Sequence, residues 1–456
     1  MTEQSVRDVV KTDLEHVWHP MLQHKGLERN PPMVVTGARG STIVDGDGRE
    51  YLDAMAGLWC VNVGYGRKEI ADAVYRQLLE LPYYPHLQIN RPAAELADKL
   101  AELTGGRLRH TYFVNSGTEA NEAAMKLARQ YQRQVRPGEP RYKFISRYLS
   151  YHGTSLATLA AGGVPERKTR FGPYGDGFVH VPPPYPYRCP FGGLEPEASE
   201  LASARALEHA ILAEGPETVA AVIMEPIQSG VGVLVPSPAY WREVQAICRR
   251  YGVLLILDEV INGFGRTGRW FAYEHYGLEP DLVSVAKGIT SGYQPLGAVL
   301  ATDAVFEAFL GEPHERREAV QVNTWGGHAA ACAAGLETLR IMEEEDLPGA
   351  AAQVGAHLLA GLETLKELPW VGDVRGKGLL AAVELVADKE TRQPLDSARV
   401  AAVVQGCKER GVIVGRSGGI GAGLGNCITL APPLVLTIAE ADRIVDVLQD
   451  TLQSLR

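Results

Sequence analysis

A lysine and two carboxylates directly follow or end apolar segments that predict buried strands. Asp258 and Glu259 end the segment VLLILDE (253–259), and Lys287 follows the next such segment, DLVSVA (281–286). Because open α/β sheets bind ligands beside the carboxyl ends of their strands, we expect the amine and a carboxylate to meet there. Each residue alone also fits an ordinary role, since strand ends often carry a capping or ion-paired carboxylate or a solvated lysine.

The combination of amine and carboxylate matches the needs of pyridoxal 5'-phosphate (PLP). The amine of Lys287 could bind the aldehyde of this cofactor, and the carboxylate of Asp258 could keep its ring nitrogen protonated, which makes the cofactor an electron sink. Once released, the same lysine could act as the general base at the substrate carbon that bears the amino group. The small neighbours Ala286 and Gly288 leave room for a ring to approach.

An anion site is predicted at the start of a long helix. Ser116, Gly117 and Thr118 stand between a strand predicted at YFVN (112–115) and that helix. Backbone amides at the start of a helix bind phosphate. Ser116 and Glu119 also match an ordinary capping box, and the two interpretations are compatible because a capped helix start can still face a phosphate.

Three glycines form a pattern that competes with this interpretation. Gly263, Gly265 and Gly268 match the G-x-G-x-x-G of dinucleotide-binding sites. However, the pattern begins beside Asp258 and Glu259, whose charge would repel a pyrophosphate, and a short aromatic segment follows in place of a long helix. The sequence therefore argues against a dinucleotide site.

The order of the predicted elements indicates an α/β protein with two domains. Strand patterns alternate with helical patterns through the middle of the chain, and the apolar runs are continuous, as is typical of a mostly parallel sheet buried on both faces. We predict a large domain over 71–325 and a smaller α+β domain formed by 1–70 and 326–456. The proline-rich segment 181–193 is expected to be a surface excursion close to the site.

Composition narrows the partners and the compartment. The chain of 456 residues carries a net charge of -10, and its basic residues are scattered, which disfavours nucleic acid as a partner. Its six cysteines have neither the spacing of a disulfide framework nor that of a metal site, so we expect no metal and a reducing compartment. A polar amino terminus and the lack of a long apolar run predict a cytoplasmic protein without a membrane segment.

Two long segments carry a resemblance to a known family. LLILDEVINGFGRTG (254–268) and DLVSVAKGITSGYQPLGAV (281–299) resemble the signature of the class III aminotransferases. Shorter segments are similar to further motifs of that family, namely SGTEAN (116–121), YHG (151–153), EP (225–226), TWGG (324–327) and RGKGL (375–379). The resemblance implies a PLP enzyme of fold type I that forms a homodimer, or a dimer of dimers, with active sites shared between subunits.

The resemblance also implies a role for each matching residue. Lys287 would hold the cofactor covalently, and Asp258 would pair with its ring nitrogen. Tyr151 would stack on one face of the ring and Val260 would press on the other. Further cofactor contacts are implied for Ser116, Gly117 and Thr118 at the phosphate, for Thr324 at the phosphate bound by the other subunit, and for His152 and Glu225.

The segment GLWCVNVGYG (57–66) resembles the branch of the family that works on ω-amines with pyruvate as amino acceptor. In that branch Trp59, together with Met21 and Tyr151, would wall the substrate pocket. Arg416 would bind the carboxylate of a substrate and swing away for an uncharged amine.

A glycine at one further position favours pyruvate as the acceptor. Gly230 follows the Gln-Ser of EPIQS, where relatives that use 2-oxoglutarate often carry a glutamate. We therefore predict a PLP-dependent ω-amine:pyruvate transaminase with a ping-pong mechanism. The alternatives are a taurine:pyruvate or β-alanine:pyruvate aminotransferase, or a PLP decarboxylase or aminomutase of the same fold. Because both Lys287 and Asp258 are present, a non-catalytic binding protein is disfavoured.

Overall fold

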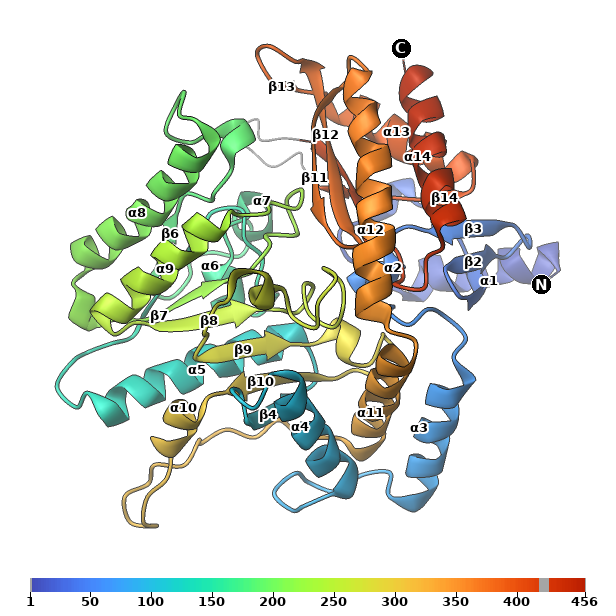
Figure 1. Ribbon diagram of the computed structural model, residues 1–456. Coiled ribbons are helices and arrows are strands. Elements are labelled where there is room, and N and C mark those ends of the chain that lie inside the picture. Colours follow the sequence, from blue (N-terminus) through green and yellow to red (C-terminus); the bar gives the residue numbers. More distant parts are fainter. Residues whose placement is uncertain (1, 418–425, 456) are drawn as a thin grey trace.

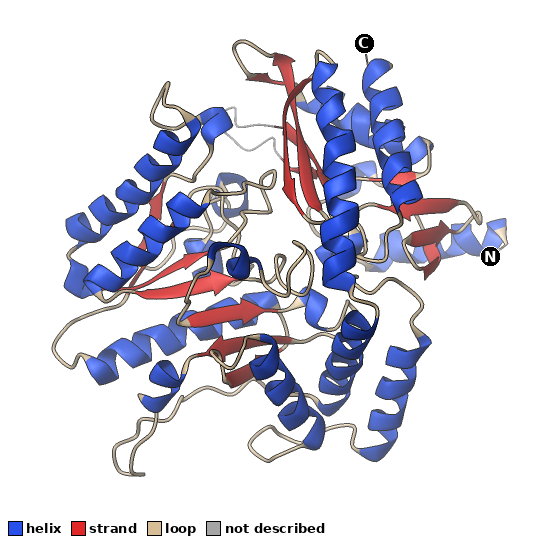
Figure 2. Ribbon diagram, viewed as in Figure 1, coloured by secondary structure: helices blue, strands red, loops and turns tan. Residues whose placement is uncertain are grey.

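The computed structural model describes residues 2–417 and 426–455, which form three β-sheets and the helices around them (Figure 1). The largest sheet has seven strands, and helices pack on both sides of it (Figure 2). In order across this sheet the strands are β4 (His110–Val114), β10 (Gly297–Ala301), β9 (Leu282–Val285), β8 (Leu254–Asp258), β7 (Val219–Met224), β5 (Lys143–Arg147) and β6 (Phe178–Val181).

The seven-stranded sheet is parallel except for one strand. From β9 through β6 all neighbouring strands run parallel, whereas β10 runs antiparallel to both β4 and β9. The central strands β7 and β8 are buried at every position, which explains their continuous apolar sequences. Successive side chains point to opposite faces, so Val222 and Met224 belong to one core cluster and Ala221 and Ile223 to another.

Different helices cover the two faces of this sheet. One face packs against the long helix α5 (Gly117–Val135), whose buried stripe of alanines lets it approach β7 to β10 closely. The other face packs against α4 (Arg91–Leu103), α8 (Pro196–Glu214), α9 (Pro238–Tyr251) and α11 (Ala329–Glu344). The carboxyl ends of β8 and β9 therefore open near the start of α5, where a site can form.

Two smaller sheets combine the beginning and the end of the chain. The four-stranded sheet consists of β1 (Val35–Arg39), β2 (Thr42–Asp45), β3 (Glu50–Asp53) and β14 (Val412–Ile413), and the parallel pair β3–β14 joins its two parts. The five-stranded sheet consists of β11 (Val371–Lys377), β12 (Leu380–Asp388), β16 (Asn426–Leu430), β15 (Gly415–Ser417) and β13 (Gln393–Pro394), and its pairs are antiparallel.

The remaining α-helices are α1 (Glu3–His16), α2 (Ala56–Trp59), α3 (Lys68–Glu80), α6 (Leu156–Ala161), α7 (Pro165–Lys168), α10 (Asp303–Glu307), α12 (Leu347–Thr364), α13 (Ser397–Glu409) and α14 (Ile438–Gln453). Short 3-10 turns are η1 (His24–Gly26), η2 (Pro186–Arg188), η3 (Pro216–Thr218), η4 (Ala272–Tyr276), η5 (Lys287–Ile289) and η6 (Leu365–Glu367). None of the helices in the described part of the chain has the length and apolar composition to cross a membrane.

The strands predicted for the large sheet are confirmed to within one or two residues, and the helix predicted over 118–134 matches α5; those strands are 112–115, 142–146, 219–225, 253–259 and 281–286. Two strands, β6 and β10, were not predicted, and because β10 alone runs antiparallel to its neighbours the sheet is mostly parallel, as expected. The proline-rich segment differs from the surface excursion we expected, because Tyr185 is only 3 % exposed and its hydroxyl donates to the carboxylate of Glu384 in β12.

Candidate functional site

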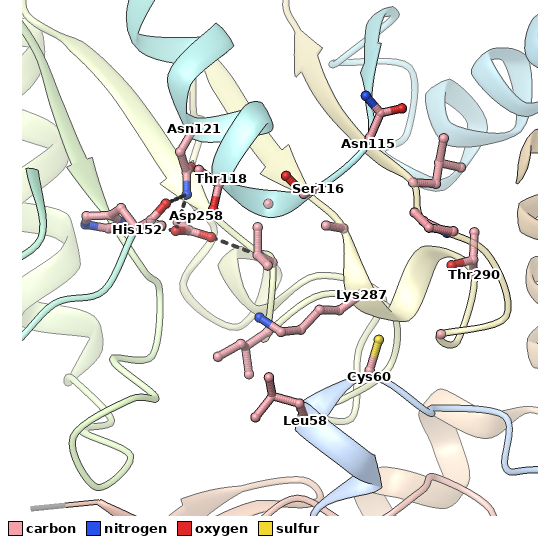
Figure 3. A pocket seen from close by; sticks show the side chains of 18 of the residues that line it. Leu58, Cys60, Asn115, Ser116, Thr118, Asn121, His152, Asp258, Lys287 and Thr290 are labelled. Carbon is pink, nitrogen blue, oxygen red and sulfur yellow. Dashed lines mark hydrogen bonds and ion pairs between the residues drawn. The ribbon is translucent and has the colours of Figure 1, made fainter. Parts of the chain in front are cut away.

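A cavity of about 390 Å³ lies at the carboxyl ends of β8 and β9, next to the start of α5 (Figure 3). The structure brings together there nine of the residues predicted from the sequence, namely Ser116, Gly117, Thr118, Tyr151, His152, Glu225, Asp258, Val260 and Lys287. They come from separate strands and loops of the seven-stranded sheet and from α5. The rule that ligands bind at strand ends is therefore sufficient to locate this cavity.

Lys287 begins the turn η5 directly after β9 and extends across the cavity (Figure 3). Its backbone is left-handed, with φ of +45°, a conformation that costs about 1–2 kcal/mol for a residue with a side chain. Burial lowers the pKa of the Lys287 amine, and the negative charge of Asp258 opposes this effect. A lowered pKa leaves more of the amine neutral near physiological pH, which is the form that attacks a carbonyl.

Asp258 is the last residue of β8 and is 4 % exposed. Its Oδ2 accepts hydrogen bonds from Asn121 Nδ2 at 2.7 Å and from His152 Nδ1 at 2.9 Å, and its Oδ1 accepts one from the backbone amide of Val260 at 3.1 Å. When Asp258 is ionised its oxygens can only accept, so His152 Nδ1 is then the donor in this contact. Three donors thus fix the orientation of the carboxylate.

The start of α5 is built to accept an anion. Ser116 is its N-cap, and its hydroxyl accepts from the amide of Glu119 at 3.2 Å. The Glu119 carboxylate accepts from the amide of Asn115 at 2.9 Å, so the reciprocal capping contact reaches Asn115 rather than Ser116. Gly117 and Thr118, the first two residues of the helix, line the cavity, and the amides of a first turn form the positive end of a helix.

A close approach of two loops explains why residue 117 is a glycine. A methyl group placed on Gly117 would lie 2.7 Å from Cγ1 and 2.9 Å from Cγ2 of Val260. Carbon atoms prefer separations of about 3.5–4.0 Å, so no side chain fits there. The glycine therefore lets Val260 and the helix start border the same narrow space.

Tyr151 and Glu225 line the wall of the cavity toward α7. The backbone amide of Tyr151 donates to Glu225 Oε1 at 3.4 Å, and the guanidinium of Arg167 lies 4.7 Å from the centre of the Tyr151 ring. Burial raises the pKa of the Glu225 carboxyl, and the neighbouring side chains of His152 and Arg147 oppose this effect.

These residues fit PLP. A buried lysine amine, an oriented carboxylate and a helix start correspond to the aldehyde, the ring nitrogen and the phosphate of that cofactor. In addition, His152 Nε2 and Asn121 Oδ1 are buried and have no hydrogen-bond partner among the described residues, which is typical of a site made to receive a polar ligand.

Four predicted residues do not line this cavity. Trp59 ends α2 beside the lining residues Leu58 and Cys60, but its side chain packs on an apolar cluster of the five-stranded sheet. Met21 is 81 % exposed. Arg416 is exposed on β15, with Nη2 3.4 Å from Asn426 Oδ1. Most of the glycine-rich segment that follows Arg416 (418–425) lies outside the described residues.

Thr324 is also exposed, and its carbonyl accepts from the hydroxyl of Tyr83 at 3.0 Å. The resemblance assigns Thr324 to the phosphate bound by the other subunit. That role does not require Thr324 to line the cavity of its own chain.

Sequence analysis did not assign a role to several residues that border the cavity. Asn121 is the most important, because its amide donates a hydrogen bond to Asp258. It lies one turn after Gly117 on the buried side of α5. A polar residue among the apolar residues of that side was the feature of the sequence that could have identified it. Ala286 was expected only to leave room for a ring. The other lining residues were given no individual role, although all but Asn115 lie in segments that carry the family resemblance: Leu58, Cys60, Asn115, Gly153, Ile261, Thr290, Gly292, Gln294, Pro295 and Leu296.

Comparisons with known proteins agree with this geometry. The family model "Aminotransferase class-III" matches residues 24–452. A taurine–pyruvate aminotransferase of Rhodobacter capsulatus is 44% identical over 99% of this chain and 98% of its own length, and a putrescine–pyruvate aminotransferase of Pseudomonas aeruginosa is 37% identical over 98% and 96%. The structure of an amine transaminase from an uncultivated Pseudomonas species, in its PLP-bound form, superposes with a TM-score of 0.91 at 38% identity, covering 97% of this chain and 99% of that one.

The full-length match in sequence, the same fold, and a cavity whose residues fit the cofactor lead to one conclusion. The chain belongs to the class III aminotransferases, PLP-dependent enzymes of fold type I.

Proposed function

We propose that the chain transfers the amino group of an ω-amine or ω-amino acid to pyruvate, releasing an aldehyde or ketone and L-alanine. The observation that carries this proposal is the cavity in which Lys287, Asp258 and the start of α5 meet. The pyruvate-dependent names of two relatives that match nearly the whole chain support the choice of acceptor.

In this proposal the cofactor is held at both of its ends. Lys287 holds it covalently, and Asp258, oriented by Asn121 and His152, keeps the proton on its ring nitrogen. When bound, PLP supplies an electron sink for the substrate carbon that loses a proton. The contacts of its phosphate and ring are Ser116, Gly117, Thr118, Tyr151, Glu225, Val260 and, from the other subunit, Thr324.

Lys287 also moves the proton in this proposal. Once released from the cofactor, its Nζ would take the proton from the substrate carbon that bears the amino group and pass it to the cofactor. In the second half-reaction it would move a proton in the opposite direction, to the corresponding carbon of the acceptor. The pKa of this amine, lowered by burial, suits it to accept a proton near neutral pH. The two half-reactions share one cavity, so we propose a ping-pong order in which the carbonyl product leaves before pyruvate enters.

Substrate recognition is assigned to the side of the cavity near α2. Trp59, Met21 and Tyr151 would border the amine, and the position of Trp59 beside the lining residues Leu58 and Cys60 supports this assignment. Arg416 would bind the carboxylate of alanine or pyruvate, since its guanidinium is exposed. Taurine is the second candidate donor, because a sulfonate could use the same arginine and a relative is named for that substrate.

The acceptor side favours pyruvate because position 230 is a glycine. A methyl group on Gly230 would lie 3.7 Å from Cβ of Tyr151, so a side chain there would lie against a residue of the cavity wall. A glutamate at this position, as in relatives that use 2-oxoglutarate, could instead neutralise an arginine of the active site.

A homodimer with shared active sites is also part of the proposal. Apolar side chains such as Tyr84, Leu87 and Ile89 are exposed on the loop after α3, and the ring of Tyr83 lies 5.0 Å from that of Trp325, next to Thr324. Such a patch is typical of a subunit interface.

We further propose a division into a large domain (71–325) and a smaller domain (1–70 and 326–456). We also propose a cytoplasmic location, which agrees with six unpaired cysteines in the described chain.

The test is a panel of donors and acceptors. Purified enzyme with PLP is incubated with putrescine, an uncharged arylalkyl amine, taurine or β-alanine, each with pyruvate or with 2-oxoglutarate, and alanine and glutamate are quantified. We expect alanine to form, to depend on pyruvate, and to be lost in Lys287→Ala. Glutamate as the main product would contradict the proposed acceptor. Turnover of the amine without any keto acid would indicate a decarboxylase or aminomutase.

A further inference from the structure

Arg266 is a fully buried arginine in the loop that follows β8. Its Nη1 donates to the carbonyls of Leu379, at 3.1 Å, and Pro432, and its Nη2 donates to Oδ1 of Asn62 at 2.8 Å. These acceptors are all neutral, and no salt bridge to Arg266 occurs within the described ranges. Burial lowers the pKa of the guanidinium, with the charge of Asp53 opposing, so placing this cation here is costly.

Asn62 connects the loop that contains Arg266 to the segment around Leu434. It is 1 % exposed, and besides accepting from Arg266 it donates from Nδ2 to the carbonyl of Phe264 at 2.7 Å. Its own carbonyl accepts from the amide of Leu434 at 2.8 Å. All of its hydrogen bonds are buried, so the side-chain amide has one fixed position.

That fixed amide lies against the turn that carries Lys287. A methyl group placed on Gly288 would lie 2.5 Å from Asn62 Nδ2 and 3.0 Å from Cβ of Phe264, so the turn packs directly on the Asn62 amide. The same two segments have a second contact, in which the backbone amide of Val63 donates to the hydroxyl of Ser291 at 3.0 Å.

The turn needs such support because its backbone is unfavourable. Lys287 and Ser291 have φ of +45° and +52°, and each left-handed residue costs about 1–2 kcal/mol. Such conformations persist only where the surroundings determine them. The contacts through Asn62 and Val63 lie at the beginning and at the end of this turn.

A purely structural role explains the arginine poorly. A buried cation contributes little net stability compared with an apolar side chain of the same volume. Its hydrogen bonds do, however, fix the position of one amide beside the peptide that follows Lys287. Sequence analysis gave no role to either residue.

We propose that Arg266, acting through Asn62, is a positioning residue that holds the turn of Lys287 so that its amine points into the cavity. The inference rests on the role proposed above for Lys287. It predicts that loss of the Arg266–Asn62 contact slows attachment of the cofactor to Lys287 more than it weakens binding of the cofactor or of the substrates.

The experiment compares Asn62→Leu with Gln132→Leu, a matched control. Gln132 is also fully buried, and its amide donates to the carbonyls of Ala220 and Gly252, away from the cavity. For each full-length protein we would measure the melting temperature, the total PLP bound, the rate at which added PLP is fixed to Lys287 by borohydride, and kcat and KM. Peptide mapping identifies the modified lysine.

For Asn62→Leu we expect attachment and kcat to fall about a hundredfold, with KM and total PLP within about twofold of wild type, because small displacements of a reacting group have effects of this size. Gln132→Leu should lower the melting temperature but leave the rate of attachment unchanged. Equal attachment rates in both variants and wild type would overturn the inference.

A double variant keeps the test valid if Asn62→Leu folds poorly. Combining Asn62→Leu with Arg266→Met replaces both partners by apolar groups, so no buried donor of the pair is left without an acceptor. The carbonyls of Phe264, Leu379 and Pro432 lose their donors, so we expect the melting temperature to recover in part while attachment stays slow. Recovery of both would show that the pair only stabilises the fold. If borohydride fixes PLP to another lysine in the wild type, the proposed function fails instead.

Discussion

A single methyl group at position 117 should disturb the cofactor site in a measurable way. In Gly117→Ala the new carbon would lie 2.7 Å and 2.9 Å from the two γ-carbons of Val260, about 1 Å closer than the preferred contact distance. Val260 cannot easily turn away, because a β-branched side chain has few allowed rotamers. Either the loop that carries Val260 or the first turn of α5 must therefore move.

The cost follows from the size of this overlap. Inserting a methyl group into a packed site typically costs about 1–3 kcal/mol. If the start of α5 moves, its amides no longer meet the phosphate in the same positions, and the cost appears as weaker PLP binding. We expect the dissociation constant for PLP to rise by about five- to 150-fold in Gly117→Ala, since each 1.4 kcal/mol is a factor of ten.

The assay is a titration of cofactor-free enzyme with PLP, followed by absorbance. Val260→Ala and the double variant complete a thermodynamic cycle, in which removal of the γ-carbons should recover at least about 1 kcal/mol of the loss caused by Gly117→Ala. Gly138→Ala is the control, because a methyl group there would have no neighbour within 4 Å, and it should bind PLP like wild type. Unchanged affinity in Gly117→Ala, or no recovery in the double variant, would refute the steric argument.

Three further predictions concern charge. Asp258→Asn should slow the amine half-reaction, measured in a single turnover, far more than it weakens PLP binding, because each unit lost from the ring-nitrogen pKa is worth about 1.4 kcal/mol. Because burial lowers the pKa of Lys287, its labelling by an amine-reactive reagent in cofactor-free enzyme should titrate below the ordinary lysine pKa of about 10.4. The amine of Lys287 binds its proton more tightly in the unfolded chain than in the folded one. The free energy of unfolding should therefore rise with pH between the pKa of Lys287 in the folded chain and its pKa in the unfolded chain. Chemical denaturation at several pH values can check this. Arg416→Ala should lower kcat/KM for pyruvate by about ten- to a hundredfold, because a hydrogen bond to a charged group is lost. The rate of a single turnover with an uncharged amine should change only a few fold. Equal losses for pyruvate and for the amine would show that another residue binds the carboxylate.

The sequence was sufficient to predict the elements whose burial is simple. β7 and β8 are surrounded on both faces, so their apolar residues are continuous and easy to recognise. The segment of β10 (Gly297–Ala301) also is fully buried, yet it follows a turn rich in glycine and proline and contains only small and aliphatic residues. Nothing in that short run distinguishes a strand from a loop, and nothing indicates that its direction is antiparallel.

The sequence predicts the place of a residue in the fold only where a local pattern determines that place. Asp258 and Lys287 directly follow or end strands, so one rule about strand ends places both in the same cavity. The contact between Asn62 and Arg266 joins segments that are far apart in the sequence, and local patterns carry no information about such a contact. For Arg416, the segment that follows closely in the sequence (418–425) lies outside the described residues, and the proposed dimer would add a second subunit.

This division has a consequence for how the chain can change its substrate. Lys287, Asp258 and the start of α5 belong to the seven-stranded sheet and its covering helix, and their geometry is fixed by buried strands. Two of the groups proposed to select the amine and the keto acid, Trp59 and Arg416, lie instead on α2 and on β15 of the five-stranded sheet, and α2 contributes Leu58 to the lining of the cavity. Substitutions there can alter the pocket without moving the amine or the carboxylate that serve the cofactor. Relatives named for taurine and for putrescine, both similar over nearly the whole chain, agree with such an arrangement.

The pair Arg266 and Asn62 is where the two parts meet, because Asn62 closely follows α2 and its amide lies against the turn of Lys287. A change of substrate pocket that displaced Asn62 would therefore also disturb the cofactor site, which limits how far that side of the cavity can be remodelled.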